Sequence, residues 1–420
     1  MKAARKKLIA GSAIALVLIS VFAIVANLKT VRKPELSQEG KPKYVFLFIG
    51  DGMGASHVAA TESYISYKEG LKGGIQLSFT KFPVLGMVTT HSADRNVTCS
   101  SASGTAIACG EKTNNTFIGI SPQGDSLKSI AYELKEKGYK IAIMSSVPVN
   151  HATPAAFYGH NTSRYDYYSL TKEIPQTGFD FFSGSGFLQY YGKDGNKKSS
   201  REILEDGGYY LCFSEEEFEK RPEKADKLIL CQPSGKDINA GDYDVDPIQP
   251  DNIQPDDIME SCLEFLGDEK PFFVMYEGGE IDWAAHENKT MPMIEYILNF
   301  EKAVNEAIKF YRKHPQETLI IVTADHETGG ISLGEGRSWD EVNIGWAKLE
   351  KIFEESGRKN YLSYEENEKL NKDAHIGWTT TSHTGGAVPI YAIGKGSERF
   401  SGRLDNTQIK AKILCSETAK

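Results

Sequence analysis

The sequence predicts an α/β fold, with a large, mostly parallel central sheet and helices on both faces. Its strands are predicted from short, nearly continuous apolar runs, rich in β-branched and aromatic residues, at 43–52, 140–146, 271–279, 318–330 and 388–396. Helical patterns lie between these runs, at 126–138 and 296–314. Because parallel strands need long crossover connections, this alternation favours a parallel sheet that helices cover on both sides.

The chain begins with a predicted export segment, residues 1–33. Basic residues precede an uncharged, largely apolar run from Leu8 to Leu28. This run is long for the core of a cleavable signal peptide, it is long enough to span a bilayer, and no clean A-x-A cleavage site follows it. The sequence therefore leaves open a cleaved signal peptide or an N-terminal membrane anchor. Either one predicts an exported protein, periplasmic or at the cell surface.

A single large catalytic domain is expected after this segment. Residues 34–42 form a polar, Pro-bounded linker, and the domain then covers 43–420. With 40% hydrophobic and 25% charged residues, the chain has enough apolar material for a large core. Residues 331–380 separate two short motifs and carry three of the four tryptophans, which predicts a lid or crown over the site. Residues 165–270 are less regular, and their acidic, lysine-rich stretch 214–227 is expected to form a solvated helix.

Charge and cysteine content narrow the class of protein. A net charge of -9 and an isoelectric point near 5.6 argue against a nucleic-acid groove, which needs a basic face. An anionic substrate would have to be held by local cations. The six cysteines include no CxxC zinc motif. A helix would separate Cys99 from Cys109 by about 15 Å, which is beyond disulfide reach. Cys212 with Cys231 is the favoured bridge.

Acidic residues, histidines and a threonine follow four of the predicted strands. One acidic residue after a strand is typical of a turn, since Asp-Gly is ordinary turn chemistry. Four such strand ends indicate a site instead, because the carboxyl ends of parallel strands meet at the edge where α/β sheets bind their ligands. The residues at these ends are Asp51, His151, Thr153, Glu277, Asp325 and His326.

Two further motifs supply candidate metal ligands. Asp282 and His286 are spaced i, i+4, so on a helix both would face one ion; the alternative is a surface capping pair. His383 lies in a Gly- and Thr-rich loop just before a strand. Carboxylates and imidazoles without thiolates suit catalytic Zn²⁺, whereas Asp, Glu and Thr oxygens alone suit Mg²⁺.

A run of very small residues at 95–113 offers a candidate nucleophile. It contains Ser100, Ser101 and Ser103 and is expected to begin a helix. A tightly packed helix is the alternative explanation for the small residues. A hydroxyl at a helix N-terminus would lie where backbone N–H groups and the helix dipole favour a phosphate. Spacing alone leaves the three serines equivalent.

Six motifs in order resemble the alkaline phosphatase family. They are "GDGMG", "TCSSASGTA", "HATPAA" with "NTSR", "EGGEIDWAAH", "TADHETGG" and "SHTGG". The resemblance covers nearly all of residues 43–396, although 165–270 and 331–380 match poorly. It implies an α/β phosphatase that hydrolyses phosphate monoesters through a phosphoserine intermediate.

The resemblance also implies a role for each candidate residue. Ser100 would be the nucleophile, and Arg164, at the end of "NTSR", would clamp two phosphoryl oxygens. Two Zn²⁺ and one Mg²⁺ are implied, and Asp51 would bridge a zinc and the magnesium. The ligands would be Asp282, His286 and His383 for one zinc, Asp51, Asp325 and His326 for the other, and Asp51, Thr153 and Glu277 for Mg²⁺, with His151 a ligand of the third metal or a neighbour that shapes its site.

Three positions depart from the pattern of well-known bacterial members. Cys99 replaces the aspartate that precedes the nucleophile and orients the arginine. His151 stands where members carry Asp or His, and Trp283 replaces a Lys or His near the phosphate. A phosphodiesterase or sulfatase of the same superfamily is the alternative enzyme, but Arg164 favours a doubly charged monoester. A catalytically silent binding protein is disfavoured because no implied zinc ligand is missing. A homodimer is left open.

Overall fold

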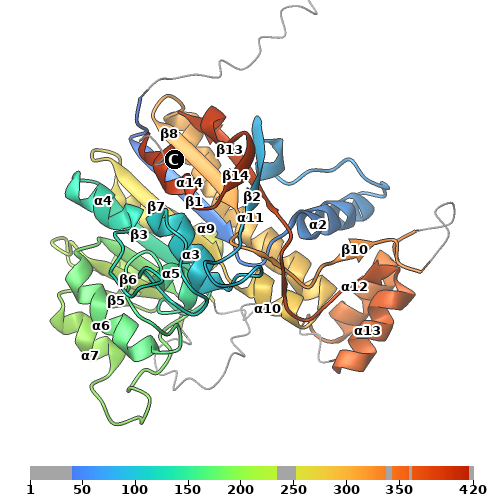
Figure 1. Ribbon diagram of the computed structural model, residues 1–420, viewed down its shortest axis with the longest axis horizontal. Helices are drawn as coiled ribbons and strands as arrows, with labels where there is room; N and C mark the ends of the chain where they lie inside the picture. Colours follow the sequence, from blue (N-terminus) through green and yellow to red (C-terminus); the bar gives the residue numbers. More distant parts are fainter. Residues whose placement is uncertain (1–39, 234–251, 337–342, 359–361, 416–420) are drawn as a thin grey trace, which may run out of the picture. The chain divides into compact units, whose positions relative to one another are not determined.

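A ten-stranded sheet runs through the computed structural model, which describes residues 40–233, 252–336, 343–358 and 362–415 (Figure 1). The strand order is β14-β2-β13-β8-β1-β7-β3-β4-β6-β5. Within this sheet only β13 runs antiparallel to its neighbours. The predicted α/β fold with a mostly parallel sheet is thereby confirmed. The strands are β1 (Tyr44–Gly50), β2 (Val84–Thr89), β3 (Lys140–Ser145), β4 (Phe181–Gly184), β5 (Tyr210–Cys212), β6 (Leu228–Cys231), β7 (Phe272–Gly278), β8 (Thr318–Thr323), β13 (Val388–Gly394) and β14 (Gly402–Asp405).

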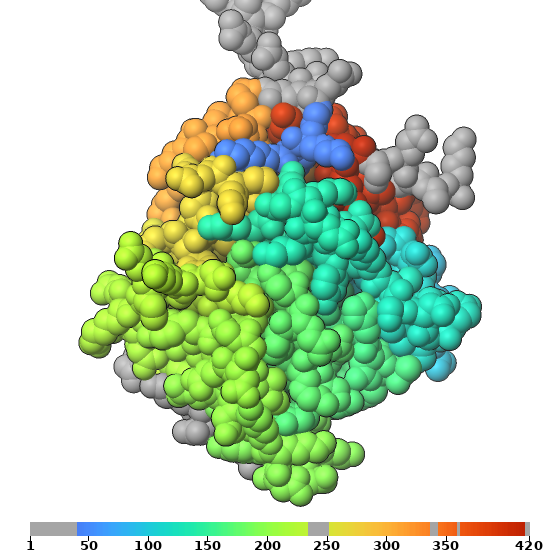
Figure 2. Space-filling model, turned by 90° about the vertical axis from the view of Figure 1, so that its left-hand side faces the viewer, coloured from blue at the N-terminus to red at the C-terminus, as the bar shows by residue number. Residues whose placement is uncertain are grey.

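The five strands predicted from apolar runs are β1, β3, β7, β8 and β13, which are consecutive in the middle of the sheet. They are apolar throughout because neighbours cover them on both faces. The strands that the sequence missed lie outside this group. β2 alternates buried and exposed residues and contains Gly86, and β4, β5 and β6 are short strands embedded in polar sequence. Part of the chain between β4 and β6 lies at the surface and is coloured yellow-green in Figure 2.

Helices cover both faces of the sheet, as adjacent residues of β7 show. Phe272 packs on Phe310 of α11, whereas Phe273 packs on Phe157, just after α5. Since successive side chains of a strand point to opposite faces, these helices lie on opposite sides. The helices are α2 (Ala55–Lys68), α3 (Ser100–Cys109), α4 (Ile130–Glu136), α5 (Ala152–Ala155), α6 (Tyr167–Thr177), α7 (Ser200–Asp206), α8 (Glu215–Glu219), α9 (Pro255–Leu266), α10 (Glu280–His286), α11 (Thr290–Lys313), α12 (Trp346–Glu355), α13 (Tyr364–Asp373) and α14 (Gln408–Leu414).

The two helices expected at 126–138 and 296–314 correspond to α4 and α11. The first is shorter than expected because Ser129 caps it, accepting a hydrogen bond from the backbone N–H of Tyr132. The second begins earlier than expected, and Pro292 is tolerated there because the first turn of a helix needs no N–H partner. Of the solvated helix expected at 214–227, only α8 forms.

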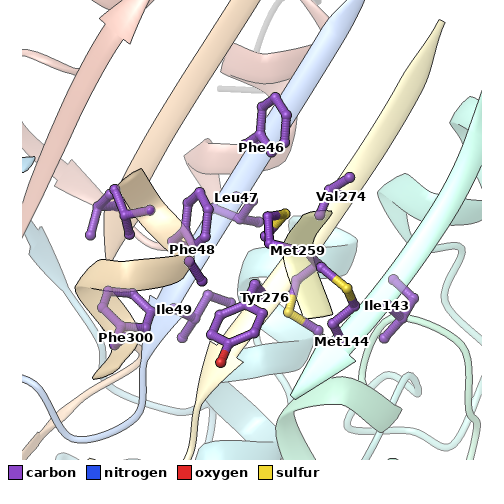
Figure 3. Close-up of a cluster of buried hydrophobic side chains, with 14 of the residues drawn as sticks. Phe46, Leu47, Phe48, Ile49, Ile143, Met144, Met259, Val274, Tyr276 and Phe300 are labelled. Atoms are coloured by element: carbon purple, nitrogen blue, oxygen red, sulfur yellow. The ribbon is translucent and has the colours of Figure 1, made fainter. Parts of the chain in front are cut away.

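An apolar cluster fixes β1 and β7 against α9 and α11 (Figure 3). Phe48 and Tyr276 of the two strands pack around Phe300 of α11, with ring centroids 5.9 and 6.1 Å from that ring. Met259 of α9 joins the cluster and is fully buried. Each such side chain contributes roughly 1.5–3 kcal/mol by burial. The strand ends that follow this cluster are therefore anchored in a fully buried part of the sheet.

The segment 331–380 contains α12, α13 and a two-stranded sheet of β10 (Ser332–Leu333) and β11 (Ile376–Gly377). Trp346 packs on Tyr64 of α2 at 5.6 Å, and its indole N–H donates to Ser63. The indole N–H of Trp378 donates to Thr290 at the start of α11. These contacts attach the segment to α2 and α11, and its role as a lid stays a prediction. Trp339 lies outside the described residues.

The predicted bridge between Cys212 and Cys231 is wrong. All six cysteines are free. In the parallel pair β5–β6, Cys212 is opposite Leu230, so Cys231 lies one residue further along its strand. A shift of one residue turns a side chain to the other face of the sheet, and the two sulfur atoms therefore point apart.

The predicted export segment 1–33 lies outside the described residues, as does the linker 34–42 up to residue 39. Among the helices that the structure does describe, none combines the length and apolar character needed to cross a bilayer. Export and anchoring therefore stay predictions.

Candidate active site

The strand ends of β1 and β8 bring two carboxylates and an imidazole together. Asp51 directly follows β1, and Asp325 and His326 are the second and third residues after the end of β8. His326 Nε2 lies 3.2 Å from Asp51 Oδ1 and 3.3 Å from Asp325 Oδ2, and all three side chains are fully buried. Gly52 has a φ of +70°, and a Cβ at this position would lie 2.8 Å from Asp282 Oδ1. The glycine after Asp51 is thus required by its conformation and by the second carboxylate.

A second group lies beside the first. Asp282 and His286 face each other across one turn of α10, with Oδ2 and Nε2 3.2 Å apart. His383 Nε2 lies 3.6 Å from Asp282 Oδ1 and 3.1 Å from His286 Nε2. The i, i+4 spacing and the loop histidine, which the sequence singled out separately, meet at one point.

Two short strands hold the groups together. β9 (Glu327–Thr328) follows His326 directly, and β12 (His383–Thr384) begins with His383. The strands pair antiparallel, with Thr328 opposite His383. This pairing stacks the rings of His326 and His383 with centroids 3.6 Å apart. The chain runs through only five residues from the end of β8 to the end of β9. Through the pairing of β9 with β12, this short stretch joins the two groups of possible ligands.

Ser100 is the serine that faces these groups. It is the first residue of α3, and its Oγ lies 3.2 Å from His326 Nε2 and 3.4 Å from Arg164 Nη1. Ser101 Oγ lies 3.1 Å from the sulfur of Cys99, and Ser103 donates to the backbone carbonyl of Asp325 at 2.6 Å. Ser101 and Ser103 are thus held by other groups, and of the three serines it is Ser100 whose hydroxyl faces the two groups.

Arg164, His151 and Thr153 come from the segment after β3. Arg164 Nη2 lies 3.3 Å from His151 Nε2, and His151 Nδ1 has no hydrogen-bond partner. Glu277, at the end of β7, accepts a hydrogen bond from the hydroxyl of Ser145. Its other oxygen and the hydroxyl of Thr153 are buried and have no hydrogen-bond partner among the residues that the structure describes. The oxygen-rich set expected for Mg²⁺ thus comes from the carboxyl ends of the neighbouring strands β1 and β7 and from α5, which follows β3.

Burial and mutual repulsion perturb the carboxylates. Burial, followed by the nearby charge of Asp282, raises the pKa of Asp51 to about 7. Burial, followed by the charge of Asp51, raises the pKa of Glu277 to about 8. The same two causes raise the pKa of Asp325 well above its usual range. Several buried carboxylates at one point are stable as anions only when cations compensate them.

The donor atoms fit metal ions. Two compact groups each offer one carboxylate or imidazole atom per residue within 4.8 Å of the others: Asp282, His286 and His383, and Asp51, Asp325 and His326. Buried atoms without hydrogen-bond partners include both oxygens of Asp51, Asp325 Oδ2, Glu277 Oε1 and Thr153 Oγ1. Nitrogen and oxygen donors suit catalytic Zn²⁺, and the oxygen set suits Mg²⁺.

A family model described as alkaline phosphatase matches residues 42–186 and 251–417. The chain belongs to the alkaline phosphatase family. The family resemblance and the prediction of a hydrolase are thereby confirmed. The gap in the match lies within 165–270, where poor agreement was expected, whereas the match continues through 331–380, where poor agreement was also expected.

Individual alkaline phosphatases support the same assignment. Alkaline phosphatase 4 of Bacillus subtilis is 31% identical over 98% of this chain and 96% of its own length. The structure of alkaline phosphatase from the Antarctic bacterium TAB5 is 28% identical, covers 90% of this chain and 98% of its own, and has a TM-score of 0.71. Alkaline phosphatase from Thermus thermophilus, 22% identical over 91% of this chain and 93% of its own with a TM-score of 0.72, shows the same fold.

Residues that help to position the alkaline phosphatase site were missed by sequence reasoning. Ser145 bonds Glu277, and the hydroxyl of Thr328 donates to Asp282 Oδ1 and lies 3.2 Å from His326 Nδ1. The carboxylate of Glu327 accepts hydrogen bonds from the Gly330 N–H and the Thr384 hydroxyl. The sequence signal that could have identified Ser145, Thr328 and Glu327 is their position within or next to the motifs of the candidate ligands. Their orientation depends on strand register, which the motifs do not specify.

Cys99, one of the departures from the alkaline phosphatase pattern, is joined to Arg164 through a strained residue. Thr116 has a φ of 75°, which is an outlier for a β-branched residue. Its N–H donates to Cys99 Sγ at 3.1 Å, and its carbonyl accepts from the Arg164 backbone N–H at 2.8 Å. Trp283 packs edge-on against His151 at 5.8 Å. Cys99 is thus linked to Arg164 through Thr116, and Trp283 contacts His151.

Proposed function

We propose that the chain hydrolyses phosphate monoesters through a phosphoserine on Ser100, at a site that binds two Zn²⁺ and one Mg²⁺. The observation that carries the proposal is the position of Ser100 Oγ, 3.2 Å from His326 Nε2 and 3.4 Å from Arg164 Nη1. The hydroxyl lies between His326, a possible metal ligand, and Arg164, the side chain that would bind the phosphoryl group.

The residues that would hold the metals are those of the two compact groups and of the oxygen set. One zinc would bind to Asp282, His286 and His383, the other to Asp51, Asp325 and His326, and Mg²⁺ to Asp51, Thr153 and Glu277. When bound, such a pair of cations stabilises the charge of the attacking and leaving oxygens and lowers the pKa of a hydroxyl to near 7. The unpartnered buried oxygens of Asp51 and Glu277 support this assignment.

The protein's own groups account for attack and orientation. Ser100 Oγ forms the bond to phosphorus while the ester oxygen leaves with the alcohol, and water later releases phosphate from the serine. The two Nη atoms of Arg164 form a permanently charged fork that matches two phosphoryl oxygens. Ser100 begins a ten-residue helix, whose N-terminal N–H groups add a partial positive charge.

His151 is assigned to the edge of the magnesium set. Variants of the TAB5 enzyme in which one histidine is replaced by aspartate or glutamate have been solved with Mg bound in the M3 site. His151 occupies a position where family members carry Asp or His, and its Nδ1 has no partner. We therefore expect His151 to shape this site, and His151→Asp to strengthen Mg²⁺ binding there.

Monoesterase activity is favoured over the alternative reactions by Arg164. A diester or sulfate ester presents one fewer charged oxygen to its fork. Rates on p-nitrophenyl phosphate, bis(p-nitrophenyl) phosphate and p-nitrophenyl sulfate, measured with metal content on the same sample, test the proposal. We expect two zinc per chain and the fastest rate on the monoester. Faster diester or sulfate hydrolysis would support the alternative enzymes, and a zinc-free, inactive protein would support a binding role.

Export, anchoring and assembly are part of the same proposal. The basic and apolar character of residues 1–33 supports translocation of the domain to the periplasm or cell surface, with or without cleavage. Fractionation of cells that produce the full chain, with N-terminal sequencing of the product, separates a cleaved signal from an anchor. Light scattering of the purified product tests the homodimer.

A further inference from the structure

Two exposed apolar side chains flank the residues that would bind the phosphoryl group. Tyr165 is 57% exposed and directly follows Arg164. Val97 is 38% exposed and precedes Ser100 by three residues. Single exposed apolar side chains are common on protein surfaces, so it is the position of these two beside Arg164 and Ser100 that carries the inference. We call Tyr165 and Val97 the apolar rim.

One loop joins the two halves of the apolar rim. The side chain of Asn115 donates to the backbone carbonyl of Val97 and accepts from the N–H of Cys99, both at 3.1 Å. The next residue, Thr116, accepts from the backbone N–H of Arg164 at 2.8 Å. The backbone of Val97 is therefore held to Asn115 and that of Arg164 to the next residue of the same loop, Thr116.

The ring of Tyr165 lies beside Arg164, the residue proposed to bind the phosphoryl group. Its centroid lies 5.9 Å from the guanidinium carbon of Arg164, whose Nη1 is 3.4 Å from Ser100 Oγ. The Tyr165 backbone is fixed at both ends, because its N–H donates to Ser163 Oγ at 3.3 Å and its carbonyl accepts from Gln189 at 3.0 Å. The exposed ring is thus attached to an ordered loop and needs little further ordering to bind a ligand.

Ser100 and the candidate zinc ligands are buried or partly buried, so the alcohol part of an ester bound there would extend toward the exposed rim. We propose that Tyr165, together with Val97, is a specificity contact that favours phosphate esters of aromatic or flat apolar alcohols over esters of small polar alcohols. The inference rests on the proposed monoesterase function. An aromatic contact of this kind increases affinity roughly threefold to tenfold.

Comparison of variants across two esters tests the apolar rim. Because each variant is compared with the unaltered enzyme on the same ester, the intrinsic reactivity of the ester cancels. For Tyr165→Ala we expect kcat/KM on phenyl phosphate to fall roughly threefold to tenfold, mainly through KM. We expect kcat/KM on glycerol 2-phosphate and inhibition by inorganic phosphate to change less than about twofold. Tyr165→Phe should retain the aryl preference.

Other outcomes overturn the inference. An equal loss on both esters and on phosphate inhibition would mean that the ring only supports Arg164. No change on either ester would mean that the ring does not contact the alcohol. Leu85→Ala, which removes a side chain of similar exposure, 58%, from β2, is the control for loss of surface apolar area.

Binding measurements separate this inference from the proposed function. Phenylphosphonate and methylphosphonate are not hydrolysed, so calorimetry compares their affinities even if the enzyme turns over no monoester. We expect the metal-loaded protein to bind phenylphosphonate more tightly, and Tyr165→Ala to reduce that preference at least threefold. Equal affinities in the unaltered protein would reject the apolar rim, whatever the activity assays show.

Discussion

The carboxylate of Glu327 accepts a hydrogen bond from the hydroxyl of Thr384, and this bond ties the strand after His326 to the strand that begins with His383. The other oxygen of Glu327 accepts from the N–H of Gly330 at 2.9 Å. Glu327 is not itself a proposed metal ligand. It joins the two strands that carry the two groups of proposed ligands and so helps to fix the distance between the groups. The separation of the two proposed zinc sites would therefore depend on a residue that is not itself a proposed ligand.

Glu327→Ala is accordingly expected to weaken zinc binding without unfolding the protein. Loss of an outer-shell partner typically costs about 10- to 100-fold in metal affinity. Competition with a chelator measures the zinc affinity, and far-ultraviolet circular dichroism checks the fold. Glu365→Ala, on the surface of α13, is the control. Unchanged zinc affinity in Glu327→Ala would show that strand pairing alone holds the ligands.

Ser100→Ala is expected to lower kcat on a monoester by roughly a thousandfold or more, because it removes the nucleophile. Zinc content should change little, since three protein ligands per ion are proposed to remain. Rapid-quench trapping of a phosphorylated chain provides a second readout. Ser101→Ala is the matched control, and its hydroxyl lies 3.1 Å from Cys99 Sγ instead of facing His326. If Ser101→Ala were inactive and Ser100→Ala active, the nucleophile would be misassigned.

Arg164→Ala is expected to reduce monoester hydrolysis and phosphate inhibition far more than diester hydrolysis. Removing a bidentate, charge-assisted contact that strengthens in the transition state costs about 2–4 kcal/mol, or roughly 30- to 1000-fold. The measurement is kcat/KM on both esters with the inhibition constant of phosphate. Arg201→Ala, at an exposed ion pair on α7, is the control. Equal losses on the two esters would argue against monoester specialisation.

The metal-stripped protein is expected to lose stability as pH rises. Asp51 and Glu277 have folded-state pKa values raised to about 7 and about 8, above their ordinary values of 3.8 and 4.5. Their neutral forms are therefore favoured in the folded protein. This contribution is fully present below about pH 4 and is lost as pH rises through 7 to 8, at a cost on the order of 4 kcal/mol per group.

Urea unfolding at pH 5 and pH 8 measures this effect. Zn²⁺ and Mg²⁺ should abolish the loss at pH 8, because cations favour the ionised carboxylates. Glu277→Gln should reduce it in the metal-stripped protein, since that carboxyl can no longer ionise. A metal-stripped protein that is equally stable at both pH values would contradict the proposed burial of uncompensated charge.

The sequence predicted the central strands and the residues of the candidate site better than the outer strands of the sheet. The five central strands were visible because burial on both faces makes them continuously apolar, and the residues after four of them form the candidate site. Short strands such as β5 carry too little pattern to be recognised, which also hid the register that separates Cys212 from Cys231. Spacing left the three serines equivalent because the contacts of each hydroxyl depend on where α3 begins, and the family resemblance alone indicated Ser100. The partnerships of Thr328 and Glu327 likewise depend on the register of two-residue strands.

Removal of the metals is expected to shift tryptophan emission to longer wavelength through Trp378. Its ring packs on Gly329, where an added Cβ would lie 2.5 Å from the indole, and Gly329 follows the β9 strand next to His326. Loss of zinc frees His326 and His383, so the pairing around Gly329 should loosen and admit water to the indole. Binding free energy that exists only in the folded site is also folding free energy, and local opening precedes global unfolding.

Single-tryptophan substitutions identify the source of this shift. Trp346 packs on Tyr64 of α2, away from the pairing of β9 and β12, so Trp346→Phe should leave the effect of EDTA on emission intact. Trp378→Phe should remove most of it, and far-ultraviolet circular dichroism should stay nearly constant because the sheet core is anchored elsewhere. Added Zn²⁺ should restore emission and activity together. If Trp283→Phe alone erased the shift, the signal would come from the residue beside Asp282, and the segment 331–380 would not be coupled to the metals.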